Sequence, residues 1–248
     1  MEAQLLSDRD LSSTAARLDS APPQEIVRWA LQNHRPGRVA VVTGLQADGV
    51  AIADMALAVD PGVRVVTIDT GRLPRATYQY IDVLRRHFGR PIEVLLPDHD
   101  DVERFVTEYG VNSFYNSAER RLDCCHHRKV APLERVLETV DCWMTGLRRS
   151  QSASRAMTPV VQRDLAHGGV VKVNPLASWS DDRVSAYLAA RGVPFHPLYA
   201  EGYTSIGCEP CTRATTAGED PRAGRWWWEY GLDKECGIHG RPVLRRTA

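Results

Sequence analysis

The sequence predicts an α/β protein with a doubly wound, mostly parallel sheet. Short apolar runs rich in β-branched residues lie at 38–43, 63–68 and 92–96, and later ones at 141–146 and 170–176. Such runs are typical of strands that are buried on both faces of a parallel sheet. Helical patterns separate them, and this alternation favours helices on both faces of the sheet.

The elements before the second strand follow from local signals. Residues 1–21 are largely polar, and we expect them to be poorly ordered. A helix is predicted to start near Pro22 and Pro23, because proline is favoured in the first helical turn. The loop 43–49 follows the first strand and leads into an apolar helix.

Three loops are expected at the carboxyl edge of the sheet, at 43–49, 69–73 and 145–149. Ligands of open parallel sheets bind outside this edge, so we expect the functional site there. From residue 196 the periodicity is lost, and Gly, Pro, Cys, Trp and Arg become frequent. The sequence therefore predicts one α/β domain at 22–217 and a flexible tail at 218–248, which a length of 248 residues can accommodate.

Composition excludes several classes of protein. The formal net charge is zero, which gives no indication of a nucleic-acid partner. The acidic start MEAQLLSDRD is unlike a signal peptide, and no apolar run approaches the roughly 20 residues that span a bilayer. We therefore expect a cytoplasmic protein without a membrane partner, in which clustered cysteines bind metal or catalyse rather than form disulfides.

The cysteines are the strongest chemical signal. Cys208 and Cys211 form a C-x-x-C motif, and Cys124 and Cys125 form an adjacent pair that is predicted to open a helix. Together they supply four thiolates, which suits a 4Fe-4S cluster and also a structural zinc site. Cys142 lies in an apolar run and is predicted to be a buried core residue.

Cys236 differs from the others because it lies near the chain end between Lys234 and His239. Both neighbours can stabilise a thiolate, the nucleophilic form of cysteine. The alternative is an incidental exposed cysteine. The run 226–228 contains three tryptophans that either anchor the tail or belong to ordinary core packing.

Five motifs then occur in a fixed order: Cys124-Cys125-x-x-Arg128-Lys129, Thr145-Gly146-Leu147-Arg148-Arg149, Gly207-Cys208-x-x-Cys211, Asp220-Pro221-Arg222-x-Gly224-Arg225-Trp226 and Glu235-Cys236-Gly237-x-His239. Together they resemble the bacterial iron–sulfur type of assimilatory adenylyl-sulfate (APS) reductase, within the family of APS and phosphoadenylyl-sulfate (PAPS) reductases. The resemblance covers about residues 22 to 241. It also implies a sheet like that of the adenine nucleotide alpha hydrolases, or PP-loop proteins.

The resemblance implies a 4Fe-4S cluster on the four paired cysteines and a catalytic tail in which Cys236 is the nucleophile. Cys236 would take the sulfur from adenosine 5′-phosphosulfate as an S-sulfocysteine and release AMP. Thioredoxin, or glutaredoxin, would then release sulfite for cysteine biosynthesis. His239 and Lys129 are the other catalytic candidates. A homo-oligomer is compatible with the sequence but not required by it.

The predicted substrate contacts fall into two groups. Asp69, Thr70, Gly71 and Arg72 follow a strand and are expected to contact adenosine; glycine there allows close approach of the ligand. The cations expected to bind the phosphate–sulfate anion are Lys129, Arg148, Arg149, Arg222 and Arg225, because guanidinium groups bind oxyanions well.

One loop departs from the family pattern, and three further functions stay open. Residues 43–48 read Thr-Gly-Leu-Gln-Ala-Asp, where many members carry a loop richer in small residues. The alternatives are PAPS reduction, a cluster-bearing nucleotide-dependent sulfur transferase, for example one acting on tRNA, and a zinc-stabilised nucleotide-binding module. The pyrophosphate loop of ATP-splitting relatives is absent, which argues against the sulfur transferase. The cluster could be structural or could polarise the site through Lys129.

Overall fold

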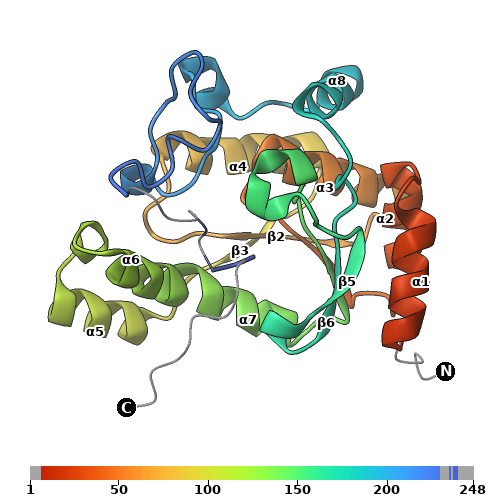
Figure 1. Cartoon of the computed structure of the whole chain (residues 1–248), viewed down its shortest axis with the longest axis horizontal. Coiled ribbons are helices and arrows are strands. Elements are labelled where there is room, and N and C mark those ends of the chain that lie inside the picture. The colour runs from red at the N-terminus through yellow and green to blue at the C-terminus, as the bar shows by residue number, and fades with distance from the viewer. Residues whose placement is uncertain (1–6, 230–234, 236, 240–248) are drawn as a thin grey trace.

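A six-stranded sheet organises the chain, with the strand order β3-β2-β1-β4-β6-β5 (Figure 1). The computed structural model describes residues 7–229, 235 and 237–239. The strands are β1 Val39–Val42, β2 Arg64–Ile68, β3 Glu93–Leu95, β4 Cys142–Met144, β5 Val161–Asp164 and β6 Val170–Val173. Neighbouring strands are parallel except β5, which runs antiparallel to β6. The predicted doubly wound, mostly parallel sheet is confirmed.

The antiparallel edge strand β5 was not predicted. Its sequence, Val-Gln-Arg-Asp, is half polar and lacks the apolar run that marks the central strands. It forms because its backbone pairs with β6 from Val161 opposite Val173 to Asp164 opposite Val170. Sheet pairing therefore decides the structure of this segment, against a weak local preference.

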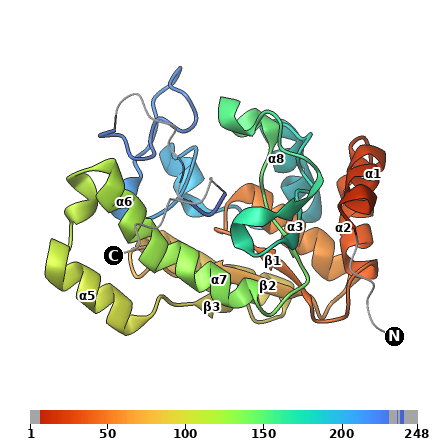
Figure 2. The same cartoon turned by 60° about the horizontal axis from the view of Figure 1, so that its bottom comes forward.

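Helices cover both faces of the sheet. They are α2 Pro23–Gln32, α3 Ala47–Val59, α4 Arg75–Phe88, α5 His99–Tyr109, α6 Ala118–Cys125, α7 Ala131–Leu137 and α8 Asp181–Arg191. Figure 1 shows α5, α6 and α7 together on one side, across the sheet from α3 and α4, and Figure 2 shows the same grouping of α5, α6 and α7. No helix in the part of the chain that the structure describes combines the length and the apolar character that a bilayer span requires.

Alternation along the strands separates two apolar cores. Val39 and Val41 of β1 belong to the larger core with α2, α3, α4 and α8. Ala40 between them faces the smaller core, which contains Trp143 of β4 and the leucines of α7. Successive strand side chains point to opposite faces, so one short strand contributes to both cores.

The expectation of poor order for residues 1–21 is wrong for residues 8–18. Asp8–Leu18 form helix α1, whose N-terminus is capped by a reciprocal pair of hydrogen bonds between Ser7 and Asp10. Leu11 and Leu18 are buried in the larger core, and α1 packs on β5. The helix was not predicted because most of its residues are polar and only a narrow apolar stripe is buried.

The cysteine pair ends a helix, so the prediction that Cys124 and Cys125 open a helix is wrong. Cys124 and Cys125 are the last residues of α6, and His126–Val130 form a π-helical turn that leads directly into α7. Single π-turns inside helices often occur at functional sites. Here the turn separates the residues that face the cysteines from those of α7 that face the smaller core.

Close packing fixes the loops at the carboxyl edge. The predicted loop 43–49 is shorter than expected, because α3 already begins at Ala47. A Cβ atom on Gly49 would lie 2.0 Å from Oγ1 of Thr43, and one on Gly146 would lie 2.8 Å from Cβ of Asp48. The loops after β1 and β4 therefore meet with no room for a larger residue.

We expect Gly49→Ala to lower the free energy of unfolding by about 1–3 kcal/mol, the usual cost of overpacking, although alanine is the better helix former. Urea unfolding measures the change. Gly44→Ala is the matched control, since nothing lies within 4 Å of its Cβ position. Equal stability of the two variants would contradict the prediction.

Candidate active site

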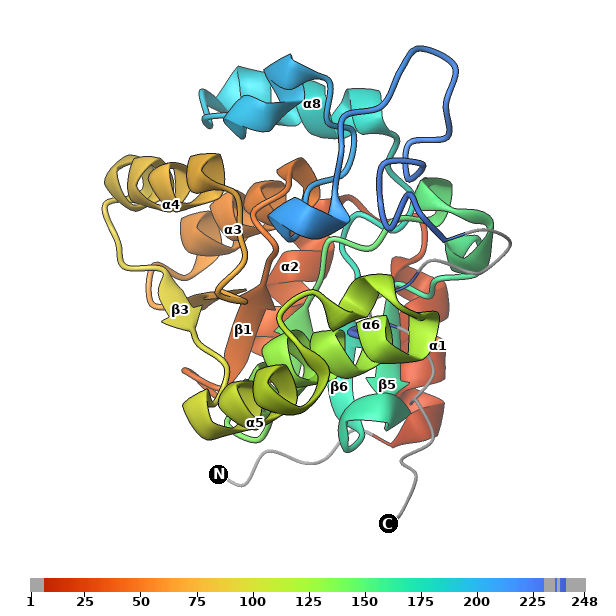
Figure 3. The same ribbon diagram turned by 90° about the vertical axis from the view of Figure 1, so that its left-hand side faces the viewer.

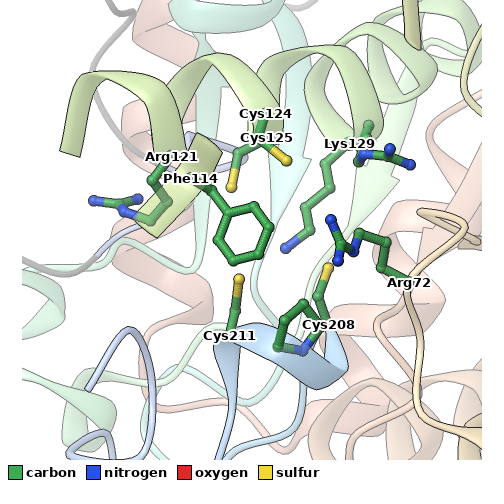
Figure 4. Close-up of a pocket in the computed structure, with 10 residues that line it drawn as sticks. Arg72, Phe114, Arg121, Cys124, Cys125, Lys129, Cys208 and Cys211 are labelled. Atoms are coloured by element: carbon green, nitrogen blue, oxygen red, sulfur yellow. The ribbon is translucent and has the colours of Figure 1, made fainter. Parts of the chain in front are cut away.

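Four cysteines from two distant parts of the chain line one small cavity, which we call the cysteine cavity. Cys124 and Cys125 come from the end of α6, and Cys208 and Cys211 from the turn Glu209–Cys211 that faces it. Figure 4 shows the side chains of both pairs converging, with Lys129 reaching between them. Figures 1 and 3 agree that the chain beyond residue 200, in blue, lies beside α6.

Cations and an apolar wall surround these sulfur atoms. The other lining residues are Arg72, Phe114, Arg121, Arg128, Lys129 and Pro210. Trp226 is fully buried and packs with Phe114, Cys208 and Cys211. Trp227 is 47% exposed, so the three tryptophans do not act alike. Trp226, together with the partly buried Trp228, holds the chain after Gly224 against the cysteine cavity.

The local field favours one thiolate in particular. Burial alone would raise the pKa of Cys208, but the Lys129 ammonium, the Thr70 hydroxyl and Arg225 together bring it below its ordinary value. The Thr70 hydroxyl lies 3.2 Å from the Cys208 sulfur. For Cys211 burial and the nearby Cys208 thiolate raise the pKa to about 11. Bringing all the thiols together as thiolates therefore requires a further positive charge.

The donor set of the cysteine cavity indicates what kind of metal group would fit. Four thiol groups converge there from two cysteine pairs, which is the donor set of a 4Fe-4S cluster. Four cysteines are also a donor set of structural zinc sites. In the part of the chain that the structure describes, the exposed His99, Asp100 and Glu103 are a separate group of possible ligands.

A second, larger cavity of about 440 Å³ lies at the carboxyl edge of the sheet, and we call it the edge cavity. Asp48 at the start of α3 and Arg148 after β4 line it, with Tyr199 opposite. The Tyr199 hydroxyl accepts a hydrogen bond from the Ala47 amide. The volume of the edge cavity falls within the roughly 300–1,000 Å³ of small-molecule sites. Its position is the one expected for a ligand site in open α/β sheets.

The two neighbouring arginines of the third loop have different environments. Arg148 is buried, donates to Asp48 at 2.6 Å and also pairs with Asp181. Burial raises the pKa of Asp48 even though Arg148 opposes that rise. Arg149 does not line the edge cavity; it pairs with Asp19 and donates to the Thr158 carbonyl at 3.0 Å. Arg149 therefore anchors the N-terminal region in this structure, and its predicted anion contact stays a prediction.

The remaining predicted arginines are divided between the cavities. Arg222 lines the edge cavity. Arg225 is buried on the cysteine side, where it donates to the Ser205 hydroxyl and the Ile206 carbonyl, each at 3.3 Å. A Cβ atom on Gly207 would lie 2.4 Å from the Arg225 guanidinium, so glycine before Cys208 gives this cation access to the cysteine backbone.

The loop that was predicted to contact adenosine lies at the cysteine cavity. Thr70 contacts Cys208, and Arg72 lines the cavity with its guanidinium 4.8 Å from the Phe114 ring centre. Gly71 has a φ of +69°, and the Asp69 carboxylate accepts from its amide and from the Tyr78 hydroxyl. None of residues 69–72 lines the edge cavity as described, so their role toward adenosine remains untested.

The described residues near the chain end lie between the two cavities; we call residues 235 and 237–239 the C-terminal segment. Arg155 holds the Glu235 carboxylate through two hydrogen bonds of 2.9 and 2.7 Å, and Arg222 lies 3.6 Å from it. Arg155 and Arg222 belong to the edge cavity. From the other side, Arg121 of the cysteine cavity donates to the Glu235 carbonyl. Cys236 and Lys234 lie outside the described residues.

His239 sits against the smaller core. Its ring stacks on Trp143, with 6.0 Å between ring centres, and His167 Nε2 donates to the Ile238 carbonyl at 3.1 Å. Burial and the nearby Lys172 and Arg155 lower the pKa of His239 well below its ordinary value. A neutral His239 could stabilise a thiolate only as a hydrogen-bond donor, not as a positive charge.

The structure brings the four paired cysteines, Lys129 and Arg72 to one cavity and Arg148 and Arg222 to the other. It also adds several residues that the sequence did not reveal. Arg121, Arg155 and Glu229 lie outside the recognised motifs and carry no local pattern. Their involvement depends on contacts between residues 80 to 114 positions apart. Cys142 is a completely buried core residue, as predicted.

Comparisons with known proteins agree on one family. The phosphoadenosine phosphosulfate reductase domain matches residues 38–214. The chain is similar to the adenosine 5′-phosphosulfate reductases of Allochromatium vinosum, with 45% identity over 84% of this chain and 81% of the relative, and of Burkholderia cepacia, with 44% identity over 93% and 89%. Its fold is similar to a crystal structure of the phosphoadenylyl-sulfate reductase of Candida auris in complex with phosphate, with a TM-score of 0.70 and 26% identity over 83% and 97% of the two chains.

A buried histidine behind Tyr199 generates a pH prediction. His196 Nδ1 accepts from the Leu198 amide, so Nε2 carries the proton toward Thr77. Burial lowers the pKa of His196 from 6.5 to about 4. Between pH 6.5 and 4 the unfolded chain therefore binds a proton at His196 that the folded chain does not bind. The free energy of unfolding falls by about 3 kcal/mol as the pH is lowered through this window.

Asparagine does not titrate, so we expect His196→Asn to lose less stability than the parent between pH 7 and pH 4.5. Urea unfolding at the two pH values measures this difference. His99→Asn is the control: its imidazole is exposed, and the hydrogen bond to Asp100 raises its pKa. An unchanged pH dependence in His196→Asn would show that His196 does not stay neutral in the folded state.

Proposed function

The chain belongs to the phosphoadenosine phosphosulfate reductase family and is an oxidoreductase acting on a sulfur group, and we propose that its substrate is adenosine 5′-phosphosulfate. The relatives that are 44–45% identical carry that substrate in their names. Reduction to sulfite and AMP would serve sulfate assimilation and cysteine biosynthesis.

The observation that carries the proposal is the position of Glu235 and Gly237, the two neighbours of Cys236. Glu235 is bound from the edge cavity by Arg155 and from the cysteine cavity by Arg121. Gly237 lies near Val130, 3.4 Å from a Cβ built on the glycine. A nucleophile between these neighbours would act where both cavities meet.

The edge cavity supplies the features that a nucleotide anion needs. Arg148, Arg155 and Arg222 line it, and guanidinium groups bind phosphate and sulfate oxygens through paired hydrogen bonds. The first turn of α3 adds the positive end of its helix dipole beside Asp48. We propose that this cavity holds the phosphate–sulfate portion, with Arg155 and Arg222 closest to the transferred group.

The transfer step then uses Cys236. Its thiolate attacks the sulfate sulfur, a new S–S bond forms, and the bond from that sulfur to the bridging oxygen breaks. AMP leaves with the electron pair of that bond, and Cys236 becomes an S-sulfocysteine. Arg222 would stabilise the charge on the departing phosphate, and His239 in its neutral form would donate a hydrogen bond toward the reacting thiolate.

Release of sulfite requires two electrons from a dithiol donor such as thioredoxin or glutaredoxin. One donor thiolate attacks the Cys236 sulfur of the adduct, and sulfite leaves as a mixed disulfide forms. The second donor thiol resolves that disulfide and restores the Cys236 thiol. Such dithiol donors operate in the reducing cytoplasm, which is the compartment that we propose for this chain.

The cysteine cavity fits a 4Fe-4S cluster held by Cys124, Cys125, Cys208 and Cys211. When bound, such a cluster would join α6 to the turn Glu209–Cys211 and supply the positive charge that several buried thiolates need. Lys129 contacts Cys208, so this lysine would add a positive charge beside the thiolates. The dithiol donor supplies both electrons, so no net redox change is needed at the cysteine cavity.

PAPS reduction is the second candidate, since the similar Candida auris structure is a PAPS reductase. The higher identity to the APS reductases favours APS, whose ribose lacks the 3′-phosphate of PAPS, as the substrate. A tRNA sulfur transferase is disfavoured, because residues 43–48 lack the pyrophosphate loop of ATP-splitting relatives.

We expect Cys236→Ser to abolish sulfite release while it leaves AMP binding and the iron content unchanged, because a serine hydroxyl is far less nucleophilic than a thiolate. Anaerobic incubation of the parent with adenosine 5′-phosphosulfate and no reductant should add one sulfite-sized mass, mapped to Cys236 by peptide analysis. Near-normal turnover of the serine variant would remove Cys236 from the mechanism.

We expect the purified protein to be brown and to contain iron and sulfide, and Cys208→Ser to lose both, because all four thiolates are needed to retain a cluster. Iron, sulfide and zinc analyses with visible spectra measure this. Cys142→Ala is the matched control, since Cys142 is buried in the other core, and it should keep the metal. A colourless parent that contains zinc would refute the cluster.

A further inference from the structure

Arg121 occupies a special position on the helix that carries the first cysteine pair. It precedes Cys124 and Cys125 by three and four residues, so all three side chains share one face of α6. Its side chain is only 3% exposed and lines the cysteine cavity. Figure 4 shows its guanidinium directed away from the cysteine sulfurs.

The guanidinium binds two places in the chain that flank residues 230–234. Nε and Nη2 donate to the Glu229 carboxylate at 2.6 and 3.0 Å, and Glu229 is itself 6% exposed. Nη1 donates to the Glu235 carbonyl at 2.7 Å. The same group lies 4.5 Å from the Trp226 ring centre. One side chain therefore joins the cysteine helix to both ends of the stretch before Cys236.

This arrangement uses properties that lysine lacks. An arginine fork offers five donors in a rigid plane, so it can bind a carboxylate with one edge and a carbonyl with the remaining nitrogen. Burying such an ion pair costs desolvation energy and does not by itself stabilise a fold. Glu229 alone satisfies the charge of Arg121, so the additional bond to the Glu235 carbonyl indicates a positioning role.

We propose that Arg121 is a positioning residue that couples the cysteine cavity to the segment carrying Cys236. Ligation of Cys124 and Cys125 fixes the end of α6, which fixes Arg121, and Arg121 fixes the backbone of the residue before the nucleophile. Because such coupling is reciprocal, docking of the C-terminal segment also stabilises the metal-bound cysteines. The inference rests on the proposed role of Cys236.

The test uses Arg121→Lys in the metal-bound protein, which keeps the charge beside Glu229 but lacks the fork. We expect amide exchange of residues 237–239 and anaerobic alkylation of Cys236 to accelerate roughly tenfold to a hundredfold, the size expected for loss of a hydrogen bond from a charged donor. The exchange of the central strands should not change. With nucleotide, kcat should fall while KM stays near that of the parent.

Arg120→Lys is the matched control, because Arg120 is the neighbouring residue on α6 but contacts Asp123 and the Tyr109 ring rather than Glu229 and Glu235. It should leave every readout unchanged. Glu229→Gln keeps Arg121 and its bond to the Glu235 carbonyl, so it should retain most of the protection of residues 237–239. If Arg121→Lys does not fold, the double variant Arg121→Gln with Glu229→Gln removes both charges and is measured in the same way.

The proposal is wrong if a folded Arg121 variant protects residues 237–239 and Cys236 as well as the parent does, or if Arg120→Lys has the same effect. Amide exchange and alkylation do not depend on catalysis. Their result therefore separates failure of the coupling from failure of the proposed function, which retained turnover in Cys236→Ser would reveal.

Discussion

Burial of four thiols in one cavity is the constraint on which the rest of the site depends. Neutral thiols can be buried cheaply, but thiolates in an apolar cavity need nearby positive charge. The chain provides it with Lys129 from the π-turn and Arg225 from the far side, and it seals the cavity with Phe114 and Trp226. These contacts oblige the chain beyond residue 200 to fold back across α6, and this brings the C-terminal segment to the carboxyl edge of the sheet.

Three arginines of the two cavities have carboxylate partners. Arg148 is neutralised by Asp48 and Asp181, Arg155 by Glu235, and Arg121 by Glu229. Partners of this kind offset the cost of keeping cations away from water. Glu235 is the residue common to both sides: its carboxylate belongs to the edge cavity and its carbonyl to the cysteine cavity.

The sequence was sufficient where local patterns carry the structure. The central strands of the sheet are continuous apolar runs, and the cysteine motifs converge because the C-x-x-C turn and the end of α6 both adjoin the carboxyl edge. It was insufficient where distant contacts decide. Helix α1 and strand β5 are stabilised by packing on each other, and Arg121 acquires its role from residues more than a hundred positions away. Arg149 adjoins Arg148 in sequence, yet its environment is different.

The π-turn at His126–Val130 has a consequence for how this helix can change over evolution. In an uninterrupted α-helix each residue rotates the next by roughly 100°, so one insertion or deletion would turn the sulfur-bearing face and the leucine-bearing face together. The wide turn accommodates one extra residue between them. A one-residue insertion or deletion within this turn would therefore shift Lys129 relative to Cys208, while Leu133 and Leu137 keep their places in the smaller core.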